Sequence, residues 1–243
     1  KIWRDNLSLW TSVIENGSNS KSMAYAYYNR GVEYENIDVN KAINDYSKCI
    51  ELDSLYKDVY INRGRLYYNM NKNEEALKDF NMAVRVDRND KAYNNRGSVL
   101  MRYGLNEEAL KDFNMALKIN QMSVETYNNR GILYVSMGKM KDAIDDYNRA
   151  EKIDSLYSQT YNNRAIAYFK LGMIDSAMYD WNKSIKLNPN NYKAYYNMGQ
   201  AYFNLKRYND AIRCYNKVLH INNNYEEARY WKNIAEKELV SNK

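Results

Sequence analysis

The stretch Tyr127-Asn128-Asn129-Arg130-Gly131 returns along this chain of 243 residues with a nearly constant step. Its last three residues, Asn-Arg-Gly, have six copies or close variants, spaced by 33 or 34 residues. The copies begin at Asn29, Asn62, Asn95, Asn129, Asn163 and Asn197. Self-similarity at a fixed period of this size is the sequence signature of a repeat protein, so the period decides the fold class.

Each repeat has the pattern of two helices joined by a turn. Tyr127, Gly131 and Tyr134 are spaced by four and three residues and therefore share one face of a first helix. Gly138 follows in the turn and suits a left-handed helix cap. A second helix is indicated by an alanine with an aromatic four residues later. These pairs are Ala42 and Tyr46, Ala76 and Phe80, Ala109 and Phe113, Ala143 and Tyr147, Ala177 and Trp181, and Ala211 and Tyr215.

This pattern resembles the tetratricopeptide repeat, which carries the same succession of aromatic and small residues. The resemblance covers nearly the whole chain and implies an all-α, right-handed superhelical solenoid of six antiparallel helix hairpins. The proline that usually closes each repeat is kept only as Pro189. We number the expected repeats one to six, at residues 24–56, 57–89, 90–123, 124–157, 158–191 and 192–225.

The two ends of the chain continue the pattern. In residues 1–23, Trp3 and Trp10 match the apolar positions of a second helix, which predicts a partial repeat or an N-terminal cap. Residues 226–243 predict a C-terminal capping helix and a short tail. The run from Trp3 to Glu15 is also similar to the segment that joins bacterial membrane glycosyltransferase-like proteins to their tetratricopeptide tails. Because the chain begins without Met, we expect it to be part of a longer protein.

Composition limits the class of protein further. Tyrosine supplies much of the expected core, with 26 Tyr against 4 Phe. Cys49 and Cys214 lie at opposite ends of the repeat array, which predicts two free thiols rather than a disulfide. The sequence has no apolar run of about 18 residues and so predicts no membrane-spanning helix. Two compartments stay open: cytoplasmic, or extracytoplasmic if the chain is the tail of a membrane protein.

The first candidate site is the row of first-helix asparagines, called here the asparagine row. Each stands two residues before the small core residue, so its side chain points about 200° away from that contact. The resemblance implies that first helices line a concave groove, where amides can bind the backbone of an extended peptide. Alternatively, the amides bond the neighbouring repeat. The expected peptide-binding residues are Asn29, Asn62, Asn95, Asn129, Asn163 and Asn197 of the row, its neighbours Asn94, Asn128 and Asn162, and Met101, Arg102, Phe169 and Lys170.

A second series pairs an arginine with an aspartate in each of the first five repeats. The arginines are Arg30, Arg63, Arg96, Arg130 and Arg164, and the aspartates are Asp45, Asp79, Asp112, Asp146 and Asp180. Repeat six loses both together, since it has Met198 and Cys214. This joint loss predicts an ion pair inside each hairpin. With these arginines neutralised, the net charge of +6 gives no reason to expect nucleic-acid binding.

The chaperone-binding members of the family hold a carboxylate-ended peptide with asparagines and cations in successive repeats. Lys91, Asn95 and Asn129 match the beginning of that pattern, but Gln159 and Asn163 bring no cation. We therefore exclude chaperone-tail binding.

Catalysis has no residues to support it. The one histidine, His220, stands near the end of a second helix, and no metal-ligand cluster or phosphate-binding loop appears. We expect no catalytic site, metal or cofactor. The second-helix series Asn81, Asn114, Asn148, Asn182 and Asn216 either bonds the next hairpin or covers the outer face.

The sequence therefore predicts a scaffold that binds an extended protein segment in its groove, as a monomer or with weak self-association. The alternative is the acceptor-presenting tail of a larger membrane-anchored enzyme, such as a glycosyltransferase.

Overall fold

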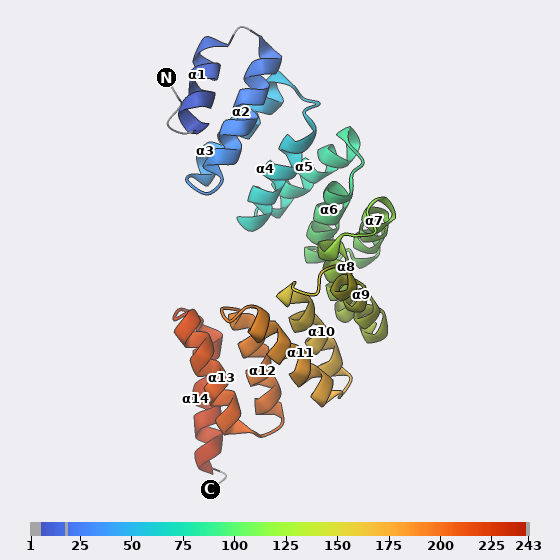
Figure 1. The fold of residues 1–243 in the computed structure, drawn as a ribbon, viewed down its shortest axis with the longest axis vertical. Coiled ribbons are helices and arrows are strands. Elements are labelled where there is room, and N and C mark those ends of the chain that lie inside the picture. Colours follow the sequence, from blue (N-terminus) through green and yellow to red (C-terminus); the bar gives the residue numbers. More distant parts are fainter. Residues whose placement is uncertain (1–5, 18, 242–243) are drawn as a thin grey trace. The chain divides into compact units, whose positions relative to one another are not determined.

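The computed structural model describes residues 6–17 and 19–241. That part of the chain forms α-helices and contains no strand (Figure 1). The helices fall into two compact units, an N-terminal unit of residues 1–121 and a C-terminal unit of residues 122–243. The all-helical fold predicted from the 33- to 34-residue period is confirmed.

In the N-terminal unit, consecutive helices pack as hairpins: α2 on α3, α4 on α5 and α6 on α7, with α1 against α2. Each hairpin also contacts the next one. The bounds are α1 (Asn6–Asn16), α2 (Ser20–Tyr34), α3 (Val39–Leu52), α4 (Lys57–Asn69), α5 (Asn73–Val86), α6 (Asp90–Arg102) and α7 (Asn106–Ile119).

The C-terminal unit repeats this arrangement, with α8 on α9, α10 on α11 and α12 on α13, and α14 packs against α13. The bounds are α8 (Val124–Ser136), α9 (Met140–Ile153), α10 (Ser158–Lys170), α11 (Ile174–Leu187), α12 (Tyr192–Asn204), α13 (Tyr208–Ile221) and α14 (Glu226–Ser241).

A small residue in each first helix lets the second-helix aromatic lie against the backbone. A methyl group added to Gly131 would come within 2.5 Å of the Tyr147 ring, and one added to Gly31 within 2.7 Å of Tyr46. Such distances are far below the usual contact between carbon atoms. The hairpins therefore need glycine at these two positions.

The turns inside the hairpins of repeats two to six contain a left-handed residue, whereas the described α2–α3 turn of repeat one has none. Gly138 has φ +75° there, as the sequence predicts, and the backbone N–H of Lys139 donates to the Tyr134 carbonyl at 2.8 Å. Two repeats reach the same conformation without glycine, at Asn71 (φ +58°) and Lys206 (φ +57°). A lysine is strained in this region, because its Cβ crowds the following carbonyl.

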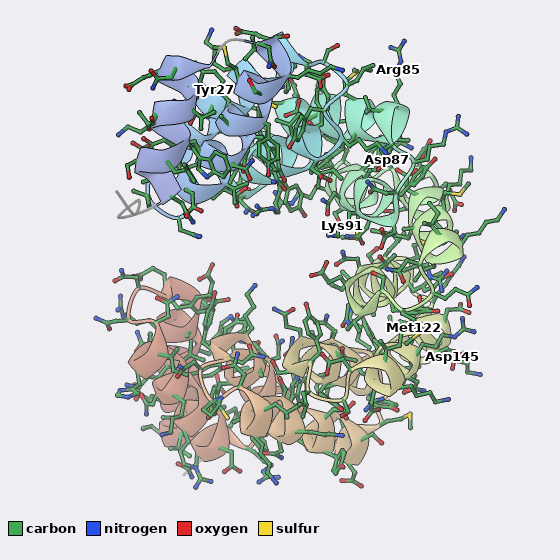
Figure 2. The ribbon with its side chains drawn as sticks, turned by 45° about the horizontal axis from the view of Figure 1, so that its top comes forward. Tyr27, Arg85, Asp87, Lys91, Met122 and Asp145 are labelled. Carbon is green, nitrogen blue, oxygen red and sulfur yellow. The ribbon has the colours of Figure 1, made fainter. Side chains whose placement is uncertain are left out.

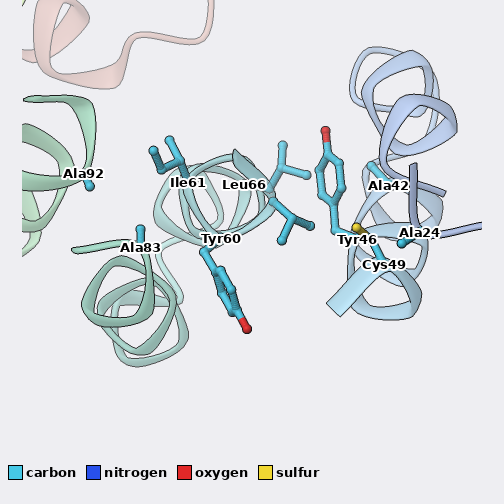
Figure 3. Close-up of a cluster of buried hydrophobic side chains, with 10 residues drawn as sticks. Ala24, Ala42, Tyr46, Cys49, Tyr60, Ile61, Leu66, Ala83 and Ala92 are labelled. Carbon is cyan, nitrogen blue, oxygen red and sulfur yellow. The ribbon is translucent and has the colours of Figure 1, made fainter. Parts of the chain in front are cut away.

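The core is built largely from tyrosine and alanine, as composition predicts. Figure 3 shows one cluster in the N-terminal unit, where Tyr46 and Cys49 are fully buried among alanines and branched side chains. The Tyr46 hydroxyl donates to Glu35 at 2.7 Å. In the C-terminal unit, Trp181 Nε1 and the Tyr215 hydroxyl are buried without a hydrogen-bond partner. Phe169 and Phe203 stand where Glu35 stands in repeat one, and they offer no acceptor.

Both cysteines are free and buried. Desolvation raises the pKa of each thiol to about 12. The thiols are therefore protonated and unreactive at neutral pH. No helix in the described ranges has the length and apolar character needed to cross a membrane.

Candidate functional site

In the N-terminal unit, the side chains of the asparagine row form hydrogen bonds with other residues of the chain. Asn29 donates to the Tyr25 carbonyl of its own helix at 2.7 Å. Asn62 donates across to the Tyr28 hydroxyl of the preceding hairpin at 3.1 Å. Asn95 accepts from Asn94 at 3.3 Å, and the Asn94 side chain is buried.

In the C-terminal unit the row is joined to its buried neighbours across the repeats. Asn163 donates to Asn128 Oδ1 at 3.4 Å, and Asn197 donates to Asn162 Oδ1 at 3.0 Å. Asn128 also donates to Thr160 Oγ1 of the next hairpin at 2.8 Å. Asn128 and Asn162 are only 4% and 7% exposed, whereas the row itself is half-buried. These amides therefore link successive first helices, α8 to α10 and α10 to α12, by hydrogen bonds.

Of the other expected peptide-binding residues, Arg102 and Phe169 make contacts within the chain. The Arg102 guanidinium lies 3.5 Å from the centre of the Tyr68 ring and donates to the Tyr68 carbonyl and to Asn71 Oδ1. Phe169 packs against Trp181, with 5.8 Å between ring centres. Met101 is half-buried and Lys170 is exposed. Arg102 and Phe169 thus contribute to packing between or within hairpins.

The five predicted ion pairs are confirmed. Every arginine of the series donates from Nε and Nη2 to the two carboxylate oxygens of its aspartate, at 2.7 to 2.9 Å. The aspartates are buried and the arginines are at most 22% exposed at the side chain. Bidentate geometry of this kind gives strong, oriented hydrogen bonds.

The same arginines make a further contact that spacing does not reveal. In Arg30, Arg63, Arg96 and Arg164, the Nη1 atom donates to a polar side chain one residue after the aromatic of the preceding helix. Arg96 reaches Asn81 at 3.2 Å and Arg164 reaches Asn148 at 2.6 Å. One of the two alternatives for the second-helix asparagines is thereby established for Asn81 and Asn148: they bond the next hairpin.

Repeats without an asparagine at that position use a hydroxyl. Arg63 Nη1 donates to Ser47 at 2.8 Å, and Arg30 Nη1 donates to Thr11 of α1 at 3.2 Å. Thr11 follows Trp10, so α1 makes the contact that a second helix makes elsewhere. Trp3 lies outside the described residues, while Trp10 packs edge-on against Tyr25 at 5.6 Å.

Repeat five adds a carboxylate to its ion pair. Glu151 accepts hydrogen bonds from Arg164 Nη1 and, at 3.0 Å, from Lys183 Nζ. Desolvation raises the pKa of Glu151, but the hydrogen bonds from Arg164 and Lys183 outweigh it and leave the pKa below its ordinary value. Glu151 is therefore ionised at neutral pH and joins α9 to α10 and α11.

Some basic residues outside these pairs lie beside acidic ones. Lys57 Nζ is 4.0 Å from Asp87, which lies near Arg85 at the end of α5 (Figure 2). Lys91, at the start of α6, is exposed. No group of three or more His, Cys, Asp and Glu side chains suited to a metal occurs among the described residues.

Comparison with known proteins identifies the repeats. A family model described as tetratricopeptide repeat matches residues 58–90, 124–155 and 192–225, and a second, described as TPR repeat, matches residues 167–206. Together these matches cover just over half of the chain. No curated protein sequence matches it.

Solved structures share the fold at low sequence identity. A chain in the crystal structure of the APC/C hetero-tetramer Cut9-Hcn1 aligns with a TM-score of 0.82 and 19% identity. The alignment covers 96% of this chain, which spans only 46% of the length of that chain. A tetratricopeptide repeat protein from Parabacteroides merdae aligns with a TM-score of 0.79 and 20% identity, over 95% of this chain and 91% of that one. YrrB, described as a TPR protein with an unusual peptide-binding site, aligns with a TM-score of 0.58 and 22% identity. The alignment covers 77% of this chain and 96% of the YrrB chain.

The hairpin repeat, its glycine and aromatic contacts and the two family models lead to the same assignment: the chain belongs to the tetratricopeptide repeat proteins.

Proposed function

We propose that this protein is a non-catalytic scaffold that binds an extended segment of another protein along its first helices, with the asparagine row as the main contact to the segment's backbone. The observation that supports this proposal is that half-buried amides recur on successive first helices in both units. Tetratricopeptide repeat proteins are generally scaffolds for protein partners, and YrrB is described as having a peptide-binding site.

The bonds of the row are compatible with a ligand. A side-chain amide has two N–H donors and an oxygen with two lone pairs. Asn197 commits one N–H to Asn162 Oδ1, which leaves its oxygen to accept from a peptide N–H. The inter-repeat bonds also fix the amide orientation in advance, which lowers the entropy lost when a ligand binds.

Residues around the row indicate what the segment carries. In the C-terminal unit, Ile132 and Ile166 stand three residues after Asn129 and Asn163 and so share their helix face. Ile132 is 39% exposed. The exposed Lys170 lies on the same face of α10. A segment with apolar side chains and acidic groups fits this surface.

The test is a peptide-array screen with the full chain beside the triple variant N129A/N163A/N197A. We expect the variant to bind the selected peptides at least about tenfold more weakly, because each lost hydrogen bond contributes roughly 0.5 to 1.5 kcal/mol. The control is N182A, which removes an exposed amide from a second helix of the same unit. Thermal melts of all three proteins accompany the screen.

Two results would reject the proposal. One is a wild-type chain that selects no peptides. The other is unchanged binding by the triple variant together with a melt several degrees lower, which would make the row a connection between hairpins only.

The second candidate is an acceptor-presenting tail of a larger membrane-anchored enzyme such as a glycosyltransferase. The contact from Arg30 to Thr11 supports a preceding partial repeat, because α1 occupies the place of a second helix. Sequencing the gene upstream of Lys1 tests this candidate. An upstream membrane-spanning segment followed by a helix that could pair with α1 would support it, and the absence of any upstream coding sequence would reject it.

A further inference from the structure

Repeat six keeps the aromatic walls of the arginine site but lacks the ion pair. In repeat five, the Arg164 guanidinium carbon lies 5.5 Å and 5.9 Å from the ring centres of Tyr161 and Tyr168. Tyr195 and Tyr202 occupy the two equivalent positions on α12.

Between these walls, the side chains that fill the site in the other repeats are replaced. Met198 stands in place of the arginine, and Cys214 of α13 in place of the aspartate. Neither is charged, since burial keeps the pKa of the Cys214 thiol at about 12. On the preceding second helix, Asn182 donates to the Met178 carbonyl of its own helix at 2.8 Å. The equivalent residue one repeat earlier, Asn148, instead accepts a hydrogen bond from Arg164.

A surface cavity of about 540 Å³ lies at this position, between α12 and α13. The residues that line it include Tyr195, Met198 and Tyr202 of α12 and Arg213, Cys214 and Lys217 of α13. Its floor is apolar, since Met198 and Cys214 are 9% and 5% exposed. The volume falls in the range of cavities that hold small ligands or single large side chains.

The rim of the cavity is cationic. Among the described residues that line it, Asp210 is the one acid, and it is ion-paired with both Arg207 and Arg213. Lys217 and His220 stand on the same side of α13 and are exposed. A cationic ligand group would therefore meet like charge here, whereas a carboxylate would be attracted.

We propose that this cavity is a second binding site, which takes one aromatic or large aliphatic side chain of a partner protein, with acidic residues on either side of it. The apolar group enters between Tyr195 and Tyr202 and covers Met198, and the carboxylates meet Lys217 and Arg213. This site is separate from the asparagine row, because Tyr195, Met198 and Tyr202 share a face of α12 that Asn197 does not.

The experiment uses the full chain with its methionine methyl groups labelled with ¹³C. The probe is an acetylated peptide with one phenylalanine flanked on each side by two glutamates. The Met198 methyl signal, assigned from M198L, should shift saturably with this peptide, and the affinity should fall as salt is added. Peptides with lysines in place of the glutamates, or alanine in place of the phenylalanine, should bind at least tenfold more weakly.

A restoring variant separates binding from stability. M198R/C214D rebuilds the ion pair of the other five repeats inside the cavity. Anisotropy of the fluorescein-labelled peptide should show loss of binding, while the thermal melt stays equal or rises. K217E changes only an exposed rim residue and should weaken binding severalfold, which keeps the test valid if the restoring variant misfolds.

Three results would overturn the proposal: no Met198 shift at millimolar peptide, equal affinity for the lysine peptide, or undiminished binding by M198R/C214D. N197A should leave the Met198 shift intact, so this site can succeed or fail independently of the asparagine row.

Discussion

Arg164 binds Asp180 through two parallel hydrogen bonds, 2.7 Å from Nε to Oδ2 and 2.9 Å from Nη2 to Oδ1. The third nitrogen of the same guanidinium donates to Asn148 of the preceding hairpin. One side chain thereby joins α10 to both α11 and α9. The same arrangement at Arg30, Arg63 and Arg96 makes the arginine series a connection between hairpins as well as within them.

Removing one partner of this pair should cost more than removing both. R164M leaves the carboxylate of Asp180, which is 1% exposed, without its counter-charge, and we expect a loss of about 3 to 5 kcal/mol in the free energy of unfolding. R164M/D180C introduces the residues of repeat six and should cost less. Urea unfolding measures both, and a double variant as unstable as the two single losses added together would contradict this.

The inter-hairpin hydrogen bond can be isolated with two matched asparagines. N148A removes an acceptor from a charged guanidinium and should destabilise the protein by about 1.5 to 3 kcal/mol. N182A is the control, since this amide bonds only its own helix backbone and repeat six has no arginine to meet it. We expect N182A to stay within about 0.5 kcal/mol of wild type by urea unfolding. Equal losses for the two variants would show that the contact to Arg164 contributes nothing.

Lys206 should be a site of easy stabilisation. Its φ of +57° is strained for a lysine, and glycine adopts it without a Cβ clash. We expect K206G to raise the free energy of unfolding by about 1 kcal/mol. N71G should gain less, because asparagine tolerates this conformation and Asn71 accepts a hydrogen bond from Arg102. A destabilised K206G in a thermal melt would mean that the lysine side chain makes a contact worth more than the strain.

Glu151 should contribute a defined part of the acid sensitivity. Its folded pKa lies below the ordinary 4.5, so the unfolded chain binds a proton more readily than the folded one. The stabilisation is complete above about pH 4.5 and is lost as the pH falls through the folded pKa. E151Q should therefore be less stable than wild type at pH 7, and the difference should shrink below pH 4.5. Urea midpoints across that range test it; a difference independent of pH would refute the ionic role.

Much of the candidate site could be predicted because spacing fixes helix faces. The joint loss of arginine and aspartate in repeat six predicts the ion pair, since Arg164 and Asp180 face each other once two helices form a hairpin. The contact from Arg164 to Asn148 could not be predicted in the same way. It depends on how closely successive hairpins approach, and the spacing within one repeat carries no such distance.

The sequence by itself therefore determined the helices, the hairpins and the pairs inside them, because a 3.6-residue helical period places each residue on a known face. Only the tertiary structure decided which amides join neighbouring hairpins, such as Asn197 to Asn162, and what became of the site where Met198 replaces an arginine. Side chains from different helices meet only after packing. Whether a lost ion pair is filled or left as a cavity depends on the volumes of the side chains around it.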